Sequence, residues 1–296
     1  MWASGRRRGR VIGLGLCVVD HLYLLDRLEL DGERTRYRDL VVSAGGMVTT
    51  AMAEAARLGC ATQVVSALGD DEPGRLLRRQ LRAANVGTRY LVGSSRLPTT
   101  VALVFVARRG GDRRFVVADR VAVERLSPRL DLAGIRRGAV LLIDGHFARD
   151  ARRAVRRAAE QSVPVVADFH RPTPNALRLL PFVTHAIVPA TFAEAFTPGR
   201  PRDTLYRLRD EFGCNPVLTQ GARGGLWLDG ARVRRFRSPR VRVVDTTGAG
   251  DAFHGAFAAG LVQGLPPARN LARAARSGAR CCTALGGVAS VVRPTR

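Results

Sequence analysis

Short apolar runs rich in β-branched residues alternate along this 296-residue chain with longer stretches rich in alanine and arginine. This alternation predicts an α/β fold with a mostly parallel central sheet, because helical crossovers that join parallel strands cover both faces of the sheet. The predicted strands span residues 11–19, 63–67, 139–143, 163–167, 185–188, 216–219 and 241–244. The predicted helices span residues 48–58, 74–84, 151–161, 202–212, 251–262 and 268–285.

Two parts of the chain do not follow this alternation. Residues 35–43 are typical of a strand, and residues 99–107 with 113–117 are typical of a hairpin around the turn Gly110-Gly111-Asp112. They predict a small antiparallel β lid, inserted at about residues 32–44 and 97–119, that covers a cleft. Because the sequence has no internal repeat, low-complexity tract or long linker, we expect residues 1–296 to form one domain with this lid.

The formal net charge of +23 comes from arginine alone, because all 48 residues counted as Lys+Arg are arginines. A basic field of this size attracts polyanions without specificity. The arginines are nevertheless spread at spacings typical of solvated helix faces, as in Arg152, Arg153, Arg156 and Arg157. No basic stretch interleaved with aromatic residues occurs. We therefore expect a solvated basic surface and no specific nucleic-acid site.

The absence of lysine excludes two phosphotransferase architectures. A P-loop needs its lysine on the phosphates, and a protein kinase needs one on its third strand.

Cysteine usage and the start of the chain favour a cytoplasmic protein. Five cysteines are present without a CxxC motif or a zinc-type spacing. Arg6 to Arg10 followed by the apolar run 11–19 imitates a signal peptide, but Asp20 follows directly, without a cleavage site of small residues. No apolar run is long enough to span a membrane, so no membrane partner is expected.

The clearest candidate site is the run Asp245-Thr246-Thr247-Gly248-Ala249-Gly250-Asp251, which lies between a predicted strand and a predicted helix. The glycines free the backbone to approach a ligand, and the amides at the helix N-terminus gather the positive end of its dipole. This predicts an anion hole beside Asp251, which would accept the proton of an attacking hydroxyl. The alternative is that Asp251 merely caps its helix.

The seven-residue run resembles the C-terminal motif of the ribokinase-like (PfkB-type) carbohydrate kinases. The N-terminal motif of that family is also present, as Gly45-Gly46 followed by an alanine-rich helix ending in Arg57-Leu58-Gly59. The resemblance covers about residues 11–290. It implies a ribokinase-like three-layer sandwich in which Asp251 deprotonates the substrate's primary hydroxyl. Its further implications are that Gly248, Ala249 and Gly250 form the hole for the phosphoryl group, and that Asp245 helps to organise the metal.

The same resemblance assigns the nucleotide site. Thr219-Gln220-Gly221-Ala222-Arg223-Gly224 resembles the ATP-binding segment of the family, so Thr219, Gly221 and Gly224 are expected to contact ATP. Taken alone, this segment is better explained as a hairpin turn. The region around Ala279 is expected to border the adenine, and its loop holds a monovalent cation such as K⁺ in relatives.

At the sugar end, the resemblance assigns substrate binding to five residues: Asp20, Gly45, Gly46, Thr50 and His146. A carboxylate at a strand's carboxyl end suits a polyol, because it only accepts hydrogen bonds. For Asp20 the alternative is a solvated loop residue, and for His146 a packed or solvent-facing histidine. Thr50 stands where ribokinase has an asparagine, which argues against ribose.

Metal handling departs from the family pattern as well. Many relatives carry an Asn-x-x-Glu motif, but the aligned positions here are Ala190 and Ala193. Either Glu194 substitutes by a shift of one residue, or Mg²⁺ depends on ATP, water and Asp245.

These observations together predict ATP-dependent phosphorylation of a primary hydroxyl of a small sugar or polyol. The residues around Asp20 and Asp251 look closest to the ketohexokinase-like and sulfofructose-kinase-like branches, which hints at a ketose. Two alternatives stay open: a nucleoside kinase of the same fold, and a non-catalytic binding or regulatory protein. The expected partners are the sugar, ATP and a second copy of the chain that pairs through the lid.

Overall fold

The computed structural model describes residues 9–28, 33–118, 122–128 and 132–292. Within them, a large sheet has the strand order β13-β12-β11-β10-β9-β8-β1-β4-β5. Its strands are β1 (Arg10–Leu14), β4 (Ala61–Gly69), β5 (Gly87–Ser94), β8 (Ala139–Ile143), β9 (Val165–Asp168), β10 (His185–Pro189), β11 (Asn215–Thr219), β12 (Gly225–Asp229) and β13 (Arg232–Phe236). Neighbouring strands from β11 to β5 are parallel, and β12 and β13 continue the sheet as an antiparallel hairpin. The predicted α/β class is confirmed.

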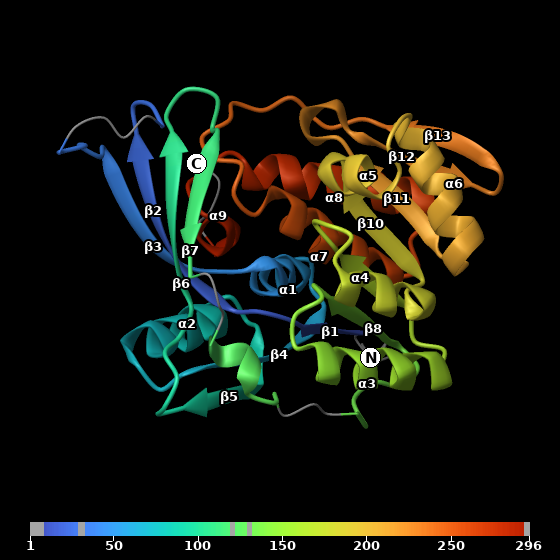
Figure 1. The fold of residues 1–296 in the computed structure, drawn as a ribbon, viewed down its shortest axis with the longest axis horizontal. Helices are drawn as coiled ribbons and strands as arrows, with labels where there is room; N and C mark the ends of the chain where they lie inside the picture. The colour runs from blue at the N-terminus through green and yellow to red at the C-terminus, as the bar shows by residue number, and fades with distance from the viewer. Residues whose placement is uncertain (1–8, 29–32, 119–121, 129–131, 293–296) are drawn as a thin grey trace, which may run out of the picture.

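Helices cover both faces of this sheet. Successive side chains on each buried strand point to opposite sides, so both faces are apolar and each packs against helices. Ile12 and Leu14 of β1 join one hydrophobic cluster, and Val11 joins the other. The first cluster includes residues of α3 (Ala148–Glu160), α4 (Pro174–Leu179), α5 (Ala190–Phe196) and α6 (Pro201–Phe212). The second includes residues of α1 (Met47–Arg57), α2 (Glu72–Ala83), α7 (Ala249–Val262), α8 (Pro267–Cys281) and α9 (Gly287–Val292). The result is the three-layer arrangement that the sequence predicts (Figure 1).

The small sheet stands beside the large one, at the upper left of Figure 1. Its order is β3-β2-β6-β7, and its strands are β2 (Val18–Leu25), β3 (Asp39–Gly45), β6 (Val101–Ala107) and β7 (Arg113–Val117). The outer pairs are antiparallel as predicted, whereas the central pair β2 and β6 is parallel. The predicted hairpin at residues 99–117 is therefore confirmed, and one strand of the lid was missed.

That missed strand is β2, which was predicted to continue the first strand of the large sheet. Where the chain leaves the large sheet after Leu14, Asp144 occupies the space beside Gly15. A Cβ atom at Gly15 would lie 2.2 Å from Asp144 Oδ2, and the same oxygen accepts a 2.9 Å hydrogen bond from the amide of Leu16. The carboxylate thus holds the backbone that connects β1 to β2.

Two further predictions are corrected by the structure. Residues 241–244 form no strand: Val241 and Val243 are 37% and 36% exposed, and the amide of Val244 bonds to the carbonyl of Cys282 at the end of α8. A run of valines therefore does not become a strand when no strand edge lies beside it. The long helix predicted at 268–285 ends at Cys281, and α9 follows after a turn.

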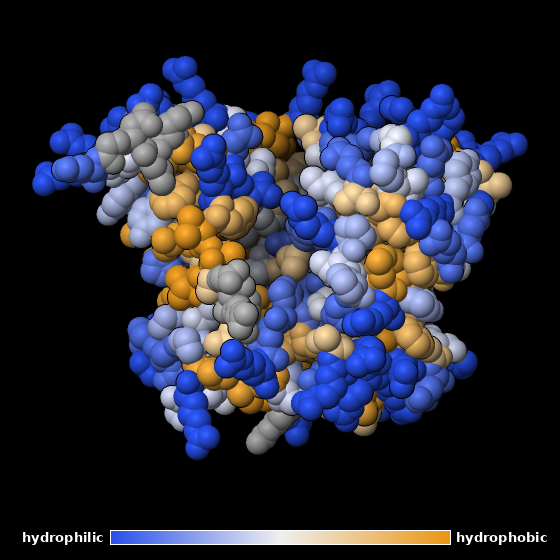
Figure 2. All heavy atoms as spheres, in the orientation of Figure 1, coloured by the Kyte–Doolittle hydropathy of each residue, from blue (hydrophilic) through white to orange (hydrophobic). Residues whose placement is uncertain are grey.

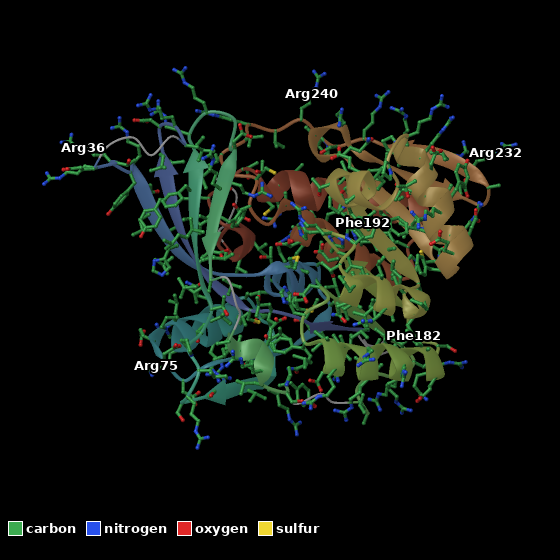
Figure 3. All side chains as sticks on the ribbon, viewed as in Figure 1. Arg36, Arg75, Phe182, Phe192, Arg232 and Arg240 are labelled. Atoms are coloured by element: carbon green, nitrogen blue, oxygen red, sulfur yellow. The ribbon has the colours of Figure 1, made fainter. Side chains whose placement is uncertain are left out.

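The arginines behave as solvated surface residues. Figure 3 labels Arg36, Arg75, Arg232 and Arg240, and all four project outward. Some ion pairs, such as Arg75 with Glu72 at 3.0 Å, lie on exposed faces, whereas Arg57 and Arg280 both pair with the buried Glu54. Within the described residues, no helix has both the length and the apolar character needed to cross a bilayer.

Candidate active site

The turn that enters α7 has the geometry of an anion hole. Gly248 caps the helix with φ of 79°, in the left-handed region that favours glycine. The amides of Gly250 and Asp251 have no acceptor among the described residues, whereas those of Ala249 and Ala252 bond to Thr246 and Gly248. Free amides at the start of a 14-residue helix bind anions well. The turn therefore provides the free amides that the predicted anion hole requires.

Gly248 is also held by close packing. A Cβ atom there would lie 2.6 Å from the Cα of Gly287 and 3.2 Å from Thr50 Cγ2. The phosphate turn is thus pressed between the start of α1 and the start of α9.

We predict that Gly248→Ala lowers the melting temperature by about 5–10 °C, because the left-handed conformation costs about 1–2 kcal/mol and the overlap adds about as much. Gly264→Ala is the matched control, since Gly264 has φ of 69° with nothing within 4 Å of a built Cβ. Gly264→Ala isolates the backbone strain, so it should lower the melting temperature less than Gly248→Ala does. Equal losses measured by calorimetry would show that the packing at Gly248 contributes nothing.

Asp251 lies in the first turn of α7, and it is partly buried. Burial, together with the nearby charge of Asp168, raises its pKa to about 6. The positive groups of His170, His254 and Arg113 partly oppose this shift. A carboxylate with this pKa is ionised at neutral pH and is a stronger base than an exposed aspartate.

Asp20 shares an electrostatic environment with Asp251. It is 6% exposed, and burial raises its pKa to about 7, with the charges of Asp251 and Asp245 adding to the effect. Its carboxylate lies against Gly45, where a Cβ atom would come 1.9 Å from Oδ2. No described residue donates a hydrogen bond to it. Asp20 is therefore not a solvated loop residue but a buried acceptor without a donor.

Sequence reasoning missed two residues beside the base. Asp168 ends β9 and His170 follows it, and each can place one ligand atom within 4.8 Å of the others and of Asp251. Asp168 is 2% exposed, and its Oδ2 has no well-aligned hydrogen bond. The available signal was an acid at the carboxyl end of a predicted parallel strand, which is where ligands bind in open α/β sheets.

A buried histidine lies behind Asp168. The Nδ1 atom of His254 is 3.2 Å from Asp168 Oδ2 and 2.7 Å from the carbonyl oxygen of Gly250. Its Nε2 atom is 3.1 Å from the carbonyl oxygen of Ile187 in β10. His254 therefore ties the ends of β9 and β10 to the turn that carries Asp251.

Asp245 occupies a different position from the one expected of a metal ligand. It is fully buried, and its two oxygens each accept a 2.8 Å hydrogen bond, from the amides of Thr247 and Gly286. It is absent from the group of Asp168, His170 and Asp251. This geometry makes Asp245 an anchor of the phosphate turn. Glu194, suggested as a substitute ligand, lies exposed on α5 and is also absent from that group.

Two predicted sugar-binding residues make other contacts. Thr50 is 1% exposed and packs near Gly248 and Gly287. His146 pairs with Glu124 through Nδ1 at 2.5 Å. Burial alone would lower the pKa of His146, but Asp144 and Glu124 together raise it to about 9. His146 is thus cationic at neutral pH, and Glu124 is a partner that the sequence did not reveal.

The predicted nucleotide residues follow β11. Thr219 ends that strand, and Gly221 and Gly224 lie around a short 3₁₀ turn with φ of 57° and 82°. Gly224 is needed sterically, because a Cβ atom there would lie 2.0 Å from the carbonyl oxygen of Phe236. Ala279 is buried inside α8, with 6% of its surface exposed.

The face drawn in Figure 2 is hollowed near its middle, between the small sheet and the side built of α5 and α6. A separate cavity of about 430 Å³ lies at the opposite ends of β1 and β8, where Arg10, Arg136 and Gly138 line it. None of the predicted site residues lines that cavity.

Comparisons with known proteins agree with this geometry. The description of the pfkB family of carbohydrate kinases matches residues 10–294. The ribokinase of Arabidopsis thaliana is 26% identical over 298 residues, which cover 95% of this chain and 78% of that protein. The solved structure of Arabidopsis thaliana ribokinase complexed with ribose and ATP superposes with a TM-score of 0.79 at 24% identity, covering 95% of each chain. The adenosine kinase of Sinorhizobium meliloti superposes with a TM-score of 0.82 at 20% identity, again covering 95% of each chain. At these identities the structural likeness shows the common fold.

Proposed function

The chain belongs to the pfkB family of carbohydrate kinases and is an ATP-dependent sugar or nucleoside kinase, and we propose that its acceptor is a primary hydroxyl of a small sugar. The observation that carries the proposal is the pairing of a partly buried carboxylate, Asp251, with helix-terminal amides in the same turn that have no acceptor among the described residues. Kinase chemistry needs both parts, because the alcohol must lose a proton while a phosphoryl group carries spread negative charge.

In this proposal Asp251 accepts the proton of the sugar hydroxyl as its oxygen attacks the γ-phosphorus of ATP. The bond from that phosphorus to the β–γ bridging oxygen breaks, and ADP leaves with the electron pair. The amides of Gly250 and Asp251 donate hydrogen bonds to the equatorial oxygens of the γ-phosphoryl group during its transfer. Holding the two substrates in line also accelerates the transfer. In a loose transition state little covalent bonding is needed, so positioning and electrostatic stabilisation provide most of the catalysis.

A divalent cation fits the residues beside the base. Two carboxylates and an imidazole offer ligand atoms within 4.8 Å, and one buried oxygen of Asp168 lacks a well-aligned hydrogen-bond donor. We propose that Asp168 and His170 hold Mg²⁺ or its waters, in place of the missing Asn-x-x-Glu motif. When bound, the cation would neutralise charge on the phosphate oxygens.

The sugar is proposed to bind at Asp20, close to Gly45 and Gly46. Asp20 has free acceptor capacity among the described residues, and the charge of Asp251 raises its pKa. Because Thr50 faces the phosphate turn, we assign it no direct contact with the sugar. A ketose remains the favoured class from the sequence resemblance.

The test is a panel of acceptors assayed by ADP release: ketohexoses, aldopentoses, polyols, and ribosides such as adenosine. Turnover with ketoses and weak turnover with ribosides would support the proposal. A preference for ribosides would establish the nucleoside kinase instead. Tight DNA binding at physiological salt without ADP release for any acceptor would favour the non-catalytic alternative.

A homodimer through the lid stays part of the proposal. Support comes from apolar side chains that the small sheet exposes to solvent, including Leu40, Phe115, Val116 and Val117, each at least 37% exposed.

A further inference from the structure

The cavity of about 430 Å³ lies at the amino ends of two neighbouring strands. β1 and β8 run parallel from this cavity, where Arg10 stands opposite Ala139, to the edge of the sheet where Asp144 follows β8 (Figure 1). Each strand has five residues and therefore spans about 17 Å. The cavity is thus separate from the candidate active site, which lies at the carboxyl ends of the parallel strands.

The wall of the cavity is positively charged. Arg10, Arg136 and Arg137 line it, and the other lining residues are glycines, one alanine and one valine. None of the described residues that line it is acidic. Its volume is within the range of small-molecule sites, which measure about 300–1,000 Å³. A wall with three guanidinium groups and no carboxylate favours an anionic ligand.

The loop that carries Arg136 and Arg137 is held on both sides. Immediately before the pair, Ile135 is fully buried in the first hydrophobic cluster. Immediately after it, the carbonyl oxygen of Gly138 accepts a 3.3 Å hydrogen bond from the amide of Arg10, which joins the loop to β1. The backbone positions of the three arginines are therefore fixed around the cavity, and binding requires little ordering of the chain.

The three guanidinium groups are available to a ligand. In the part of the chain that the structure describes, none of them forms an ion pair or a side-chain hydrogen bond. By contrast, Arg153 and Arg157 on α3 pair with Asp150 and Glu160. All three arginines of the cavity are exposed to solvent. Each keeps its five N–H donors for a ligand that enters from solvent, and no ion pair has to break.

Charge and geometry indicate which anion fits. A phosphate group carries about −1.5 to −2 charges at neutral pH, so two phosphate groups match three guanidinium groups better than one does. Guanidinium groups also bind phosphate oxygens through pairs of parallel hydrogen bonds. The arginines come from two segments, β1 and the loop before β8. A ligand with two phosphate groups can therefore contact both segments at once.

We propose that this cavity is a second binding site, which takes a small molecule that carries at least two phosphate groups. Arg136 and Arg137 bind its phosphates from the loop, and Arg10 binds them from β1. The site does not depend on the proposed kinase function, because no residue of the catalytic proposal lines it. Binding there can be measured whether or not the protein phosphorylates a sugar.

The test is calorimetric titration of the full chain with inorganic pyrophosphate at physiological salt, with saturating ADP present to fill the proposed nucleotide site. Arg136→Ala/Arg137→Ala and Arg10→Ala remove the cavity charges of the two segments. The matched control is Arg152→Ala/Arg156→Ala, which removes two exposed arginines of α3 that do not line the cavity. It lowers the net charge as much as the first variant does, so it measures the effect of the general basic field.

The wild type should bind pyrophosphate at least about tenfold more tightly than single phosphate. The double cavity variant should weaken pyrophosphate binding at least about tenfold and Arg10→Ala about fivefold, whereas the α3 variant should stay within about twofold of wild type. Should the double cavity variant lose its cooperative melt, Arg10→Ala decides the matter.

Four results would overturn the inference. They are the absence of saturable binding, equal affinity for single phosphate, an equal loss in the α3 variant, and binding that survives the cavity substitutions. A short DNA duplex that binds more tightly than pyrophosphate and competes with it would assign these arginines to nucleic acid instead.

Discussion

Replacing Asp251 by asparagine should lower kcat by about 10³-fold while leaving the affinity for ATP within about tenfold of wild type. The amide keeps the size of the side chain but cannot accept the proton of the sugar hydroxyl. Steady-state kinetics with the best acceptor and titration with ATP would measure the two quantities. Activity comparable to wild type would remove Asp251 from the mechanism.

The control addresses the possibility that Asp251 only caps its helix. Asp203 occupies the first turn of α6, as Asp251 occupies that of α7, but it is exposed and far along the chain from the phosphate turn. Asp203→Asn should change stability slightly and kcat not at all. A loss of kcat in both variants would indicate a general helix effect.

The same carboxylate predicts a pH dependence. Burial and the charge of Asp168 raise the pKa of Asp251 to about 6, and the base must be ionised to act. The kcat/KM for sugar should therefore be level above about pH 7 and fall about tenfold per unit below about pH 6. A profile that stays flat down to pH 4.5 would show that no group with this pKa acts as the base.

Replacing Asp20 by asparagine should raise the KM for sugar at least about tenfold, because hydrogen bonds to a charged acceptor contribute about 1.5–3 kcal/mol. The variant should nevertheless be more stable than wild type at pH 8. Burial, with the charges of Asp251 and Asp245, raises the pKa of Asp20 to about 7 from its ordinary value of 3.8. Ionising this carboxyl therefore opposes folding.

The sign follows from proton binding in the two states. Between about pH 4 and pH 7 the folded protein holds the Asp20 proton and the unfolded chain does not, so stability falls as the pH rises. The penalty is complete above about pH 7 and reaches at most about 4 kcal/mol. The melting temperature of Asp20→Asn should exceed that of wild type by about 5 °C at pH 8 and match it near pH 4.

Asp26→Asn is the matched control for Asp20. Asp26 follows the same strand but is exposed and pairs with Arg38 at 2.6 Å. Its replacement should leave the KM unchanged and should not stabilise the protein at pH 8. An unchanged KM in Asp20→Asn would refute the assignment of Asp20 to the sugar.

If the predictions for Asp251 and Asp20 hold, the unliganded site has unfavourable electrostatics at its carboxylates, and binding of the substrates relieves them. The charge of Asp251 raises the pKa of Asp20, and that of Asp168 raises the pKa of Asp251. Binding of a polyol and a cation would then offset part of the cost of desolvating the two carboxylates. This trade between stability and function is common at active sites.

The sequence alone was sufficient for those features that depend on local order along the chain. The alternation of apolar runs with helical stretches predicts the parallel sheet, since each strand and helix is specified by its own residues. The turn at 245–251 is equally local: glycines, helix start and carboxylate lie within seven positions, so their relative placement follows from helix geometry. The hairpin around Gly110-Gly111-Asp112 was predictable for the same reason.

Only the tertiary structure decided which distant residues surround that turn. Asp168, His170 and Asp251 come together because the carboxyl ends of parallel strands meet at one edge of the sheet. Arg113 reaches Thr246 across 133 positions, and Asp144 binds the amide of Leu16 across 128. Contacts of this kind depend on how whole elements pack, and packing leaves no pattern in neighbouring residues. The valines at 241–244 illustrate the same limit, because a strand forms only where another strand edge lies beside it.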